Sequence, residues 1–241
     1  MSTSKFEAFK ASNRTVQPQT SKRVIFEHYE ADLGYDNLET QEGVARLYLT
    51  PEGKYPSITT VLGSMPKPGL DAWRKRVGEK EANRVSKFAS TRGTAVHELL
   101  ERYVDNVDDY VAKAPLHVVS NFLEVKDILD ERLTLVYGQE RALYSRHLGI
   151  AGRVDLIGEW DGKPAIIDYK TSARIKPRKF CYDYFAQEAG YAVMWEERTG
   201  QPITQLVTLI AGDEGAQVFV EHRDEWIGRL ITAKKHYDSI Q

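Results

Sequence analysis

Hydrophobic and polar positions divide the chain into strand-like and helix-like stretches. Short apolar or alternating runs are typical of strands, and they occur at 44–49, 133–137, 149–170 (as a pair), 203–211 and 216–220. Apolar residues spaced three and four apart indicate helices with one buried face, and this spacing recurs at 69–104, 116–133, 183–199 and 222–239. The pattern therefore predicts a chain that contains both helices and strands.

For two of the helical stretches the sequence also predicts where the helix breaks or which face is buried. Residues 69–104 are predicted to form two helices that break near Ser90–Gly93, with His97 at the edge of an apolar stripe on the second. A lone histidine in that position is more often a hydrogen-bonded structural residue than a ligand. In the helix at 116–133, four apolar residues are predicted to face inward: Leu116, Val119, Leu123 and Leu129.

Composition limits the compartment more than it limits the function. Lys plus Arg number 33 and Asp plus Glu number 35, so the net charge argues neither for nor against a nucleic-acid partner. The single cysteine, Cys181, excludes an internal disulfide framework. No apolar run is long enough to span a membrane, and no secretory signal is visible. These features predict a cytoplasmic protein that has no membrane partner.

The first 23 residues differ in composition from the rest of the chain. Residues 1–23 are rich in Ser, Thr, Gln and Lys and poor in large apolar groups, so we predict a flexible leader. Their low acid content also resembles an organellar transit peptide. Residues 24–241 are numerous enough to form one domain with a proper core.

The most informative stretch is 149–170, which reads as two strands joined at Asp161-Gly162, a strong hairpin signal. Asp155 interrupts the first strand, and Asp168 and Lys170 close the second. Because side chains alternate along a strand, Asp168 and Lys170 share a face, and the hairpin can bring Asp155 near it. Carboxylates inside apolar strands are costly unless something pairs with them. The arrangement predicts a site for Mg²⁺ or Mn²⁺, which favour oxygen ligands. The alternative is an Asp–Lys surface pair.

Two further stretches are candidates for contact with phosphates. In the run 55–62, the hydroxyls of Ser57, Thr59 and Thr60 could bind phosphate before a helix or form an ordinary helix cap. The first half of 69–104 combines cations with an aromatic residue: Trp73, Arg74, Lys75, Arg76, Lys80, Arg84 and Lys87. Such a surface can bind a nucleic-acid backbone, and it is equally the make-up of a solvated helix face.

Five short motifs follow one another along the chain. They are Tyr55-Pro56-Ser57-Ile58-Thr59-Thr60-Val61-Leu62, Arg92-Gly93-Thr94-Ala95-Val96-His97, Gly152-Arg153-Val154-Asp155, Asp168-Tyr169-Lys170-Thr171 and Gln187-Glu188-Ala189-Gly190-Tyr191. Each motif is weak alone. Together, over about 55–220, they resemble the PD-(D/E)xK nuclease superfamily, in particular its RecB-like exonuclease branch, which includes phage exonucleases.

The resemblance implies an α/β fold with a restriction-endonuclease-like core. A central mixed β-sheet would be flanked by helices and carry an N-terminal helical and β extension. Residues 24–241 would then form a single nuclease domain. It would consist of a helical wall at about 69–133, a catalytic core at about 134–220 and a C-terminal helix at about 222–239.

The resemblance also implies roles for individual residues. The catalytic group would be Asp155, Asp168, Lys170, Gln187 and Tyr191. The metal ligands would be His97, Asp155, Asp168 and the backbone carbonyl of Tyr169. The expected DNA contacts are Ser57, Thr59, Thr60, Trp73, Arg74, Arg92 and Thr171. Glu140 lies where some relatives place another acid, and its role stays open at this point.

The family context sets the expected activity and partners. We expect a Mg²⁺- or Mn²⁺-dependent DNA exonuclease that acts on ends or single strands in DNA processing, degradation or recombination. If it is phage-encoded, its setting would be the host cytoplasm. No iron–sulfur cluster is expected, because the required cysteines are missing. Without a P-loop, a helicase would be a separate chain, as would a recombinase or a single-strand-binding protein. The alternatives are a structure-specific endonuclease on the same fold and a catalytically inactive nucleic-acid-binding module.

Overall fold

A computed structural model describes residues 23–29, 31–43 and 45–241, so nearly all of the predicted leader lies outside the described residues. The centre is a six-stranded sheet with the strand order β1, β5, β6, β7, β8, β9. The strands are β1 (Glu27–His28), β5 (Leu133–Ser145), β6 (Ile150–Trp160), β7 (Lys163–Ser172), β8 (Gln205–Gly212) and β9 (Gln217–His222). Two neighbouring pairs, β1–β5 and β7–β8, are parallel, and the others are antiparallel.

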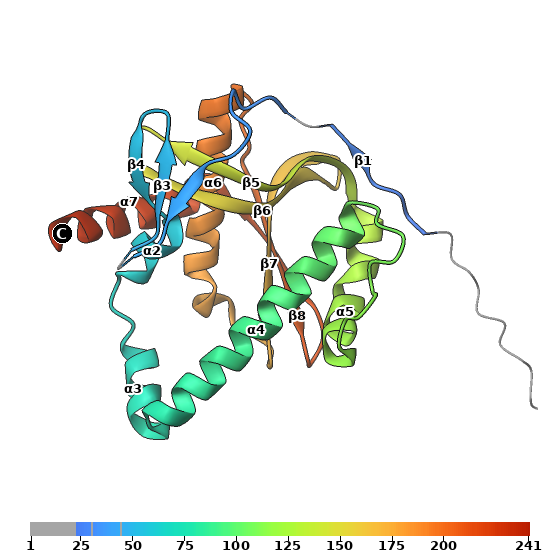
Figure 1. The fold of residues 1–241 in the computed structure, drawn as a ribbon, viewed down its shortest axis with the longest axis horizontal. Coiled ribbons are helices and arrows are strands. Elements are labelled where there is room, and N and C mark those ends of the chain that lie inside the picture. The colour runs from blue at the N-terminus through green and yellow to red at the C-terminus, as the bar shows by residue number, and fades with distance from the viewer. Residues whose placement is uncertain (1–22, 30, 44) are drawn as a thin grey trace, which may run out of the picture.

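Helices cover both faces of this sheet (Figure 1). On one face lie α4 (Glu79–Val104) and α5 (Leu116–Arg132). On the other lie α2 (Ile58–Gly63), α6 (Tyr182–Thr199) and α7 (Arg223–Ser239). Because the central strands are buried on both faces, they read as nearly continuous apolar runs. The mixed sheet flanked by helices confirms the predicted α/β fold with a restriction-endonuclease-like core.

The expected N-terminal extension is a small antiparallel sheet of β2 (Glu39–Gln41), β3 (Leu47–Thr50) and β4 (Gly53–Pro56). Aromatic contacts join this region to the main sheet: the rings of Tyr35, which precedes β2, and Tyr55 of β4 lie 5.6 and 6.1 Å from that of Tyr144 on β5. The chain then enters α2 at Ser57. No helix in the described part of the chain combines the length and the apolarity that crossing a bilayer requires.

The hairpin between β6 and β7 forms where the sequence predicts it. Asp161 and Gly162 make the turn with φ values of 53° and 72°. Left-handed backbone at both central positions is the geometry that suits the twist of a two-residue hairpin. Arg132 at the end of α5 pairs with the Asp161 carboxylate. The turn therefore fixes how β6 and β7 lie against each other.

The helix at 69–104 differs from the prediction. It does divide into two, but the break is at Gly78, whose φ is 84°, between α3 (Pro68–Val77) and α4. The helix continues through Ser90–Gly93. Arg92 forms an ion pair there with Asp213 at 3.0 Å. Tertiary contacts thus stabilise a segment whose Ser, Thr and Gly residues suggested a break.

The buried face of α5 also differs from the prediction. Leu116 and Leu123 are 88% and 55% exposed. Only Leu129 of the four predicted residues is fully buried, and its buried neighbours on the helix are Val118, Phe122 and Val125. Both sets of residues have helical spacing, so the pattern alone does not choose between them. The contact with the sheet selects the face with the β-branched and aromatic residues.

Gly158 provides a test of how tightly β5 and β6 pair. A Cβ at this position would lie 2.4 Å from the backbone oxygen of Leu135. We expect Gly158→Ala to reduce the free energy of unfolding by about 1–3 kcal/mol, the usual effect of overpacking. The control is Gly228→Ala in α7, where a Cβ meets nothing within 4 Å. That change should stabilise the helix by about 0.5–1 kcal/mol. Denaturant unfolding followed by circular dichroism measures both, and equal effects would contradict the close strand pairing.

Candidate active site

Strands β6 and β7 diverge at the candidate site. Their pairing runs from Trp160–Lys163 to Leu156–Ile167. Beyond that point the carboxylate of Asp155 replaces a strand partner, because its Oδ2 accepts the N–H of Tyr169 at 2.8 Å. Strand β7 continues along β8, where Asp168 lies opposite Thr208. Asp155 is therefore held at the fork between two strands, with 13% of its side chain exposed.

Asp168 and Lys170 lie on the same face of β7, toward α6. The Asp168 side chain is 1% exposed, and its Oδ2 forms an ion pair with the Lys170 ammonium. Its Oδ1 accepts a hydrogen bond from Nε2 of Gln187 at 3.3 Å. Tyr169, between them, points to the opposite face, and its ring meets that of His97 edge-on at 5.8 Å. The alternation of one strand thus places the acid and the lysine against one helix and the tyrosine against another.

Burial and neighbouring charges shift the pKa values of this pair in the same direction. Burial raises the pKa of Asp168 to about 6, against the opposing effect of Lys170 and with a further increase from Asp155. Burial alone would lower the pKa of Lys170, but the carboxylates of Asp168 and Asp155 outweigh it and raise this pKa above its ordinary value. The lysine is therefore held as an ammonium ion.

A group that could hold a metal ion lies on the α4 side of the fork. His97, Glu140 and Asp155 each offer one ligand atom, and these atoms lie within 4.8 Å of one another. The Nδ1 of His97 is 3.5 Å from Oδ2 of Asp155. Asp168 is not part of this group, because its oxygens face Lys170 and Gln187. Two carboxylates with an imidazole fit Mn²⁺ well, and carboxylate oxygens also suit Mg²⁺.

Glu140 enters this group because β5 is irregular there. Its backbone has φ of 49°, a conformation that is uncommon for a residue with a side chain. Arg153 Nη1 donates to the Glu140 carbonyl oxygen at 2.8 Å, and its Nη2 donates to Asn37 at 3.3 Å. Burial, with the nearby charges of Asp155 and Glu101, raises the pKa of Glu140 to about 7. The arginine of the third sequence motif therefore supports the backbone of a candidate ligand.

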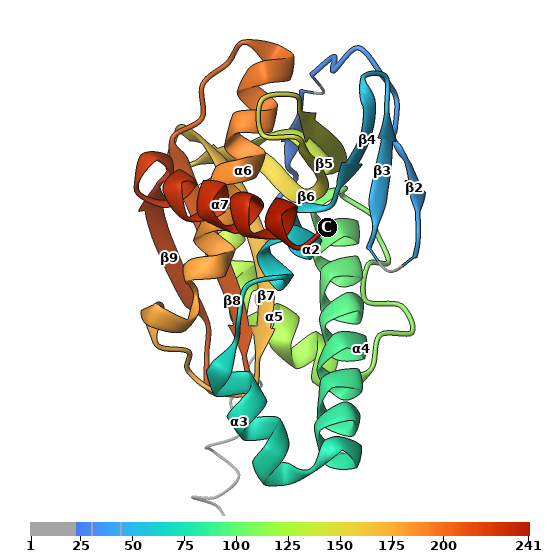
Figure 2. The same cartoon turned by 90° about the vertical axis from the view of Figure 1, so that its left-hand side faces the viewer.

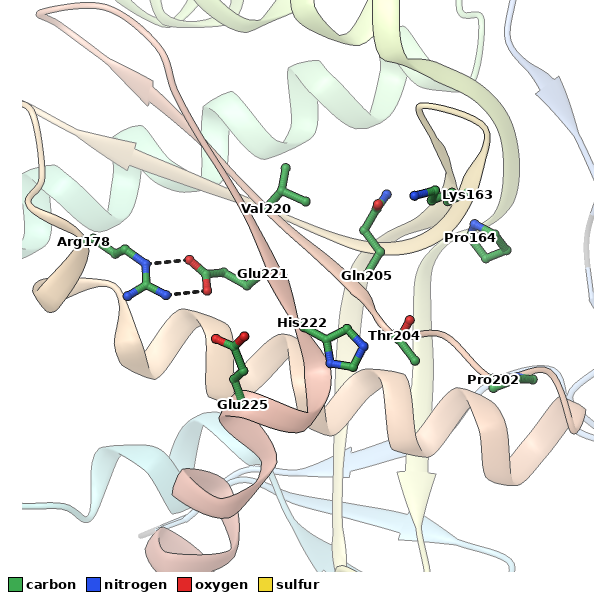
Figure 3. A pocket seen from close by; sticks show the side chains of 10 residues that line it. All are labelled: Lys163, Pro164, Arg178, Pro202, Thr204, Gln205, Val220, Glu221, His222 and Glu225. Atoms are coloured by element: carbon green, nitrogen blue, oxygen red, sulfur yellow. Dashed lines mark hydrogen bonds and ion pairs between the residues drawn. The ribbon is translucent and has the colours of Figure 1, made fainter.

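The group opens into a cavity of about 650 Å³, which Arg46, Glu98, Glu101 and Arg153 also line. A different cavity of about 810 Å³ lies at the beginning of β7 (Figure 3). It contains the paired side chains of Arg178 and Glu221, and it shares no residue with the group around Asp155. The cavity beside the fork is therefore the candidate active site.

Two glycines of the sequence motifs allow close packing around α6: Gly152 lets α6 approach the sheet, and Gly190 lets α2 approach α6. A Cβ on Gly152 would lie 2.7 Å from the ring of Tyr191, and one on Gly190 would lie 2.4 Å from Ile58. Four residues apart on α6, Gln187 and Tyr191 share a face, so that Nε2 of Gln187 lies 3.4 Å from the Tyr191 hydroxyl and also reaches Asp168. The expected Gln-x-x-x-Tyr pair thus lines the Asp168 side of the site.

Other residues expected at the site lie elsewhere. Ser57 caps α2 by accepting the N–H of Thr60 at 3.0 Å, and its hydroxyl also contacts those of Thr59 and Thr60. The helix-cap alternative therefore describes these hydroxyls. Arg92 was expected to contact DNA, but it is 7% exposed and paired with Asp213, so we remove it from the DNA-binding surface.

The remaining expected DNA contacts lie on α3 and β7. Trp73 and Arg74 are on α3, none of whose residues is buried. Thr171 is partly exposed near the end of β7, and its hydroxyl would lie 3.6 Å from a Cβ on Gly93 of α4. These three side chains are accessible from outside the core.

Sequence reasoning missed three charged residues near the fork. Arg153 supports Glu140, Glu101 lies four residues after His97 on the same helix, and Glu188 is completely buried on α6. The hydroxyl of Thr208 donates to Glu188. The spacing of Glu101 from His97 was a usable signal, and so was a carboxylate among the apolar residues of α6.

The chain is similar in sequence to known nucleases. The family profile described as the PD-(D/E)XK nuclease superfamily matches residues 72–233. Human mitochondrial genome maintenance exonuclease 1 is 27% identical over 130 residues, which are 51% of this chain and 38% of the human protein. The match thus spans well under half of that relative. The crystal structure of SSO0001 has a TM-score of 0.34 and 14% identity over 61% of this chain and 74% of that one, which is a weak likeness.

The raised pKa values predict a pH-dependent metal affinity. Metal binding requires deprotonated carboxylates, so Mn²⁺ affinity should increase between about pH 5 and pH 8, with proton release, in isothermal titration calorimetry. Glu140→Gln should weaken binding by at least about tenfold, whereas Glu124→Gln on the exposed face of α5 should not.

The raised pKa of Glu140 also predicts that the stability of the metal-free protein depends on pH. The pKa of Glu140 rises from 4.5 to about 7 on folding, so its contribution to the free energy of unfolding decreases as the pH rises through this range. Denaturant unfolding of Glu140→Gln should show a smaller decrease than the wild type. A Mn²⁺ affinity that is independent of pH, or unchanged in Glu140→Gln, would contradict the assignment.

Proposed function

Because the chain belongs to the PD-(D/E)XK nuclease superfamily, which confirms the resemblance in its sequence, we propose that it is a divalent-metal-dependent DNA exonuclease. The superfamily makes it a nuclease. The observation that supports the more specific proposal is the meeting of Asp155, Asp168 and Lys170 at the fork beside an open cavity. A structure that merely buried an Asp–Lys pair would need neither the cavity nor the neighbouring His97 and Glu140.

The metal would be held by His97, Glu140 and Asp155, with Asp168 and the Tyr169 carbonyl oxygen beside them. A bound Mg²⁺ or Mn²⁺ would supply Lewis-acid chemistry by neutralising charge on the phosphodiester and favouring ionisation of the attacking water. The crowding of carboxylates supports this proposal, because like charges held together in a partly buried site are costly without a counter-ion.

The protein groups around the metal ligands would orient the reaction. Lys170 is positioned from two sides, by its ion pair with Asp168 and by the ring of Tyr184, whose centre lies 5.1 Å from Nζ. From there its ammonium can hold the attacking water and stabilise negative charge that develops on the phosphate. Gln187 and Tyr191 offer further donors on the α6 side. Most of these groups lie on regular strands and helices, which fixes their positions before substrate binds.

Two observations favour action on DNA ends. The relative that matches part of this chain is named as an exonuclease, and α3 with the first half of α4 extends away from the sheet (Figure 2). These two segments have cationic side chains and bury only Ala82 before Arg92. We propose that they form a wall that guides a DNA strand toward the cavity.

Lys170 tests the proposed chemistry. Wild type should shorten end-labelled linear DNA when Mg²⁺ or Mn²⁺ is present, and EDTA should abolish this. Lys170→Ala should cut at least about 100-fold more slowly, as expected for loss of a group that stabilises developing charge. Lys163→Ala, an exposed lysine on the same strand, is the matched control and should keep its activity.

Closed circular DNA separates the alternatives in the same assay. An exonuclease leaves closed circles intact, whereas cleavage of circles would show an endonuclease. If DNA binds but remains uncut under either metal, the protein is an inactive binding module, and the proposed activity is wrong.

The cations of α3 test the proposed wall. Lys75→Ala should weaken DNA binding and reduce the slope of log affinity against log salt by about 0.7–0.9, the value for one lost phosphate contact. Lys235→Ala on α7 serves as the control and should leave the slope unchanged. Fluorescence anisotropy with labelled DNA in EDTA gives both quantities, and an unchanged slope for Lys75→Ala would remove α3 from the DNA path.

A further inference from the structure

The segment between β7 and α6 carries charges and an exposed ring that the proposed chemistry does not use. Residues 174–180, here called the basic loop, contain two lysines and two arginines and no acidic residue. Phe180 at its end is 64% exposed, and Ile175 is 50% exposed. We propose that the basic loop binds a single strand of the DNA substrate, with Phe180 as the surface on which a base stacks. This inference rests on the proposed nuclease function.

A single side chain, that of Tyr184, lies between the basic loop and Lys170, the proposed catalytic lysine. Lys176 Nζ donates to the hydroxyl of Tyr184 at 2.5 Å and lies 4.7 Å from the centre of its ring. Lys170 Nζ lies 5.1 Å from the centre of the same ring. Tyr184 is therefore shared between the loop and the candidate active site, so a strand on the loop is close to the place of cleavage.

The backbone of the loop is fixed by side chains from the β8–β9 hairpin. The N–H of Ile175 donates to Glu214 at 2.9 Å, and the N–H of Lys176 donates to Gln217 Oε1 at 2.7 Å. Gln217 Nε2 donates in return to the Lys176 carbonyl oxygen at 3.0 Å. A loop held in this way loses little conformational entropy when it binds a ligand.

The charges of the loop are only partly neutralised. Arg178 is committed to Glu221 through two hydrogen bonds of 2.7 and 2.6 Å (Figure 3). Glu214 is committed to the backbone of Ile175. Arg174 and Lys179 are exposed, and among the described residues neither forms an ion pair. The ammonium of Lys179 lies 5.3 Å from the ring centre of Phe180, so a phosphate and a base could be bound side by side.

These features favour a single strand over a duplex. An exposed ring can stack only on a base whose face is free, and in a duplex the bases are stacked on one another. Stacking on an aromatic side chain contributes about 1–3 kcal/mol per base, while adjacent cations contact the backbone. The basic loop also lies near the start of α3, since Lys67 is 3.7 Å from Asp183 in the first turn of α6. A strand guided by α3 would therefore reach the loop.

The test compares three substitutions of Phe180 with a control. Phe180→Ala and Phe180→Leu should weaken binding of a labelled single-stranded oligonucleotide about 5- to 150-fold, the range for one lost stacking contact. Both should leave binding of a blunt duplex unchanged. Phe180→Tyr keeps the aromatic face and should bind like the wild type. So should Leu123→Ala, which removes an exposed apolar residue of α5. Fluorescence anisotropy in EDTA separates binding from cleavage.

Several results would overturn the proposal. One is unchanged single-strand affinity in Phe180→Ala, and another is an equal loss for single strands and duplex. Normal binding by Phe180→Leu would show that apolar bulk is sufficient and that no base stacks on this ring. Cleavage by the wild type is measured in parallel with Mn²⁺. If the wild type cuts DNA while Phe180→Ala binds normally, only the loop assignment fails. If the wild type neither binds nor cuts DNA, the proposed function fails as well.

Discussion

The constraint on which the rest of the site depends is the crowding of carboxylates where β6 and β7 diverge. Asp168 and Glu140 are withdrawn from water and each is repelled by Asp155, which raises their pKa values to about 6 and about 7. The structure offsets part of this cost with a backbone N–H from Tyr169, an ammonium from Lys170 and an amide from Gln187. The remaining cost is what a divalent cation would relieve.

The surrounding fold explains how these groups can be held so closely. Helix α6 approaches the sheet because Gly152 of β6 leaves room for Tyr191, and α2 packs closely on α6 because Gly190 leaves room for Ile58. Helix α4 runs unbroken along the other face and presents His97 to Asp155. Between them, Arg153 supports the unusual backbone of Glu140. Residues from four of the five motifs thus meet at this site or pack beside it, whereas the hydroxyls of the first motif cap α2.

Sequence reasoning predicted the parts of the site that depend on local geometry. Strand alternation placed Asp168 and Lys170 together, the Asp-Gly turn brought Asp155 beside them, and the family resemblance brought in His97, Gln187 and Tyr191. It left the role of Glu140 open, because the position of this side chain depends on a left-handed residue inside a strand. It also placed Arg92 on the DNA surface, since its partner Asp213 is distant in sequence. The buried face of α5 was wrong because two apolar faces satisfy the same spacing.

The most direct test of the account is to locate the metal. Crystals grown with Mn²⁺ give anomalous scattering that places the ion independently of any activity assay. We predict a peak at the fork, within bonding distance of His97, Asp155 and at least one of Glu140 and Asp168. Absence of a peak there under conditions in which Mn²⁺ supports cleavage, or a peak only at another site, would contradict the central claim.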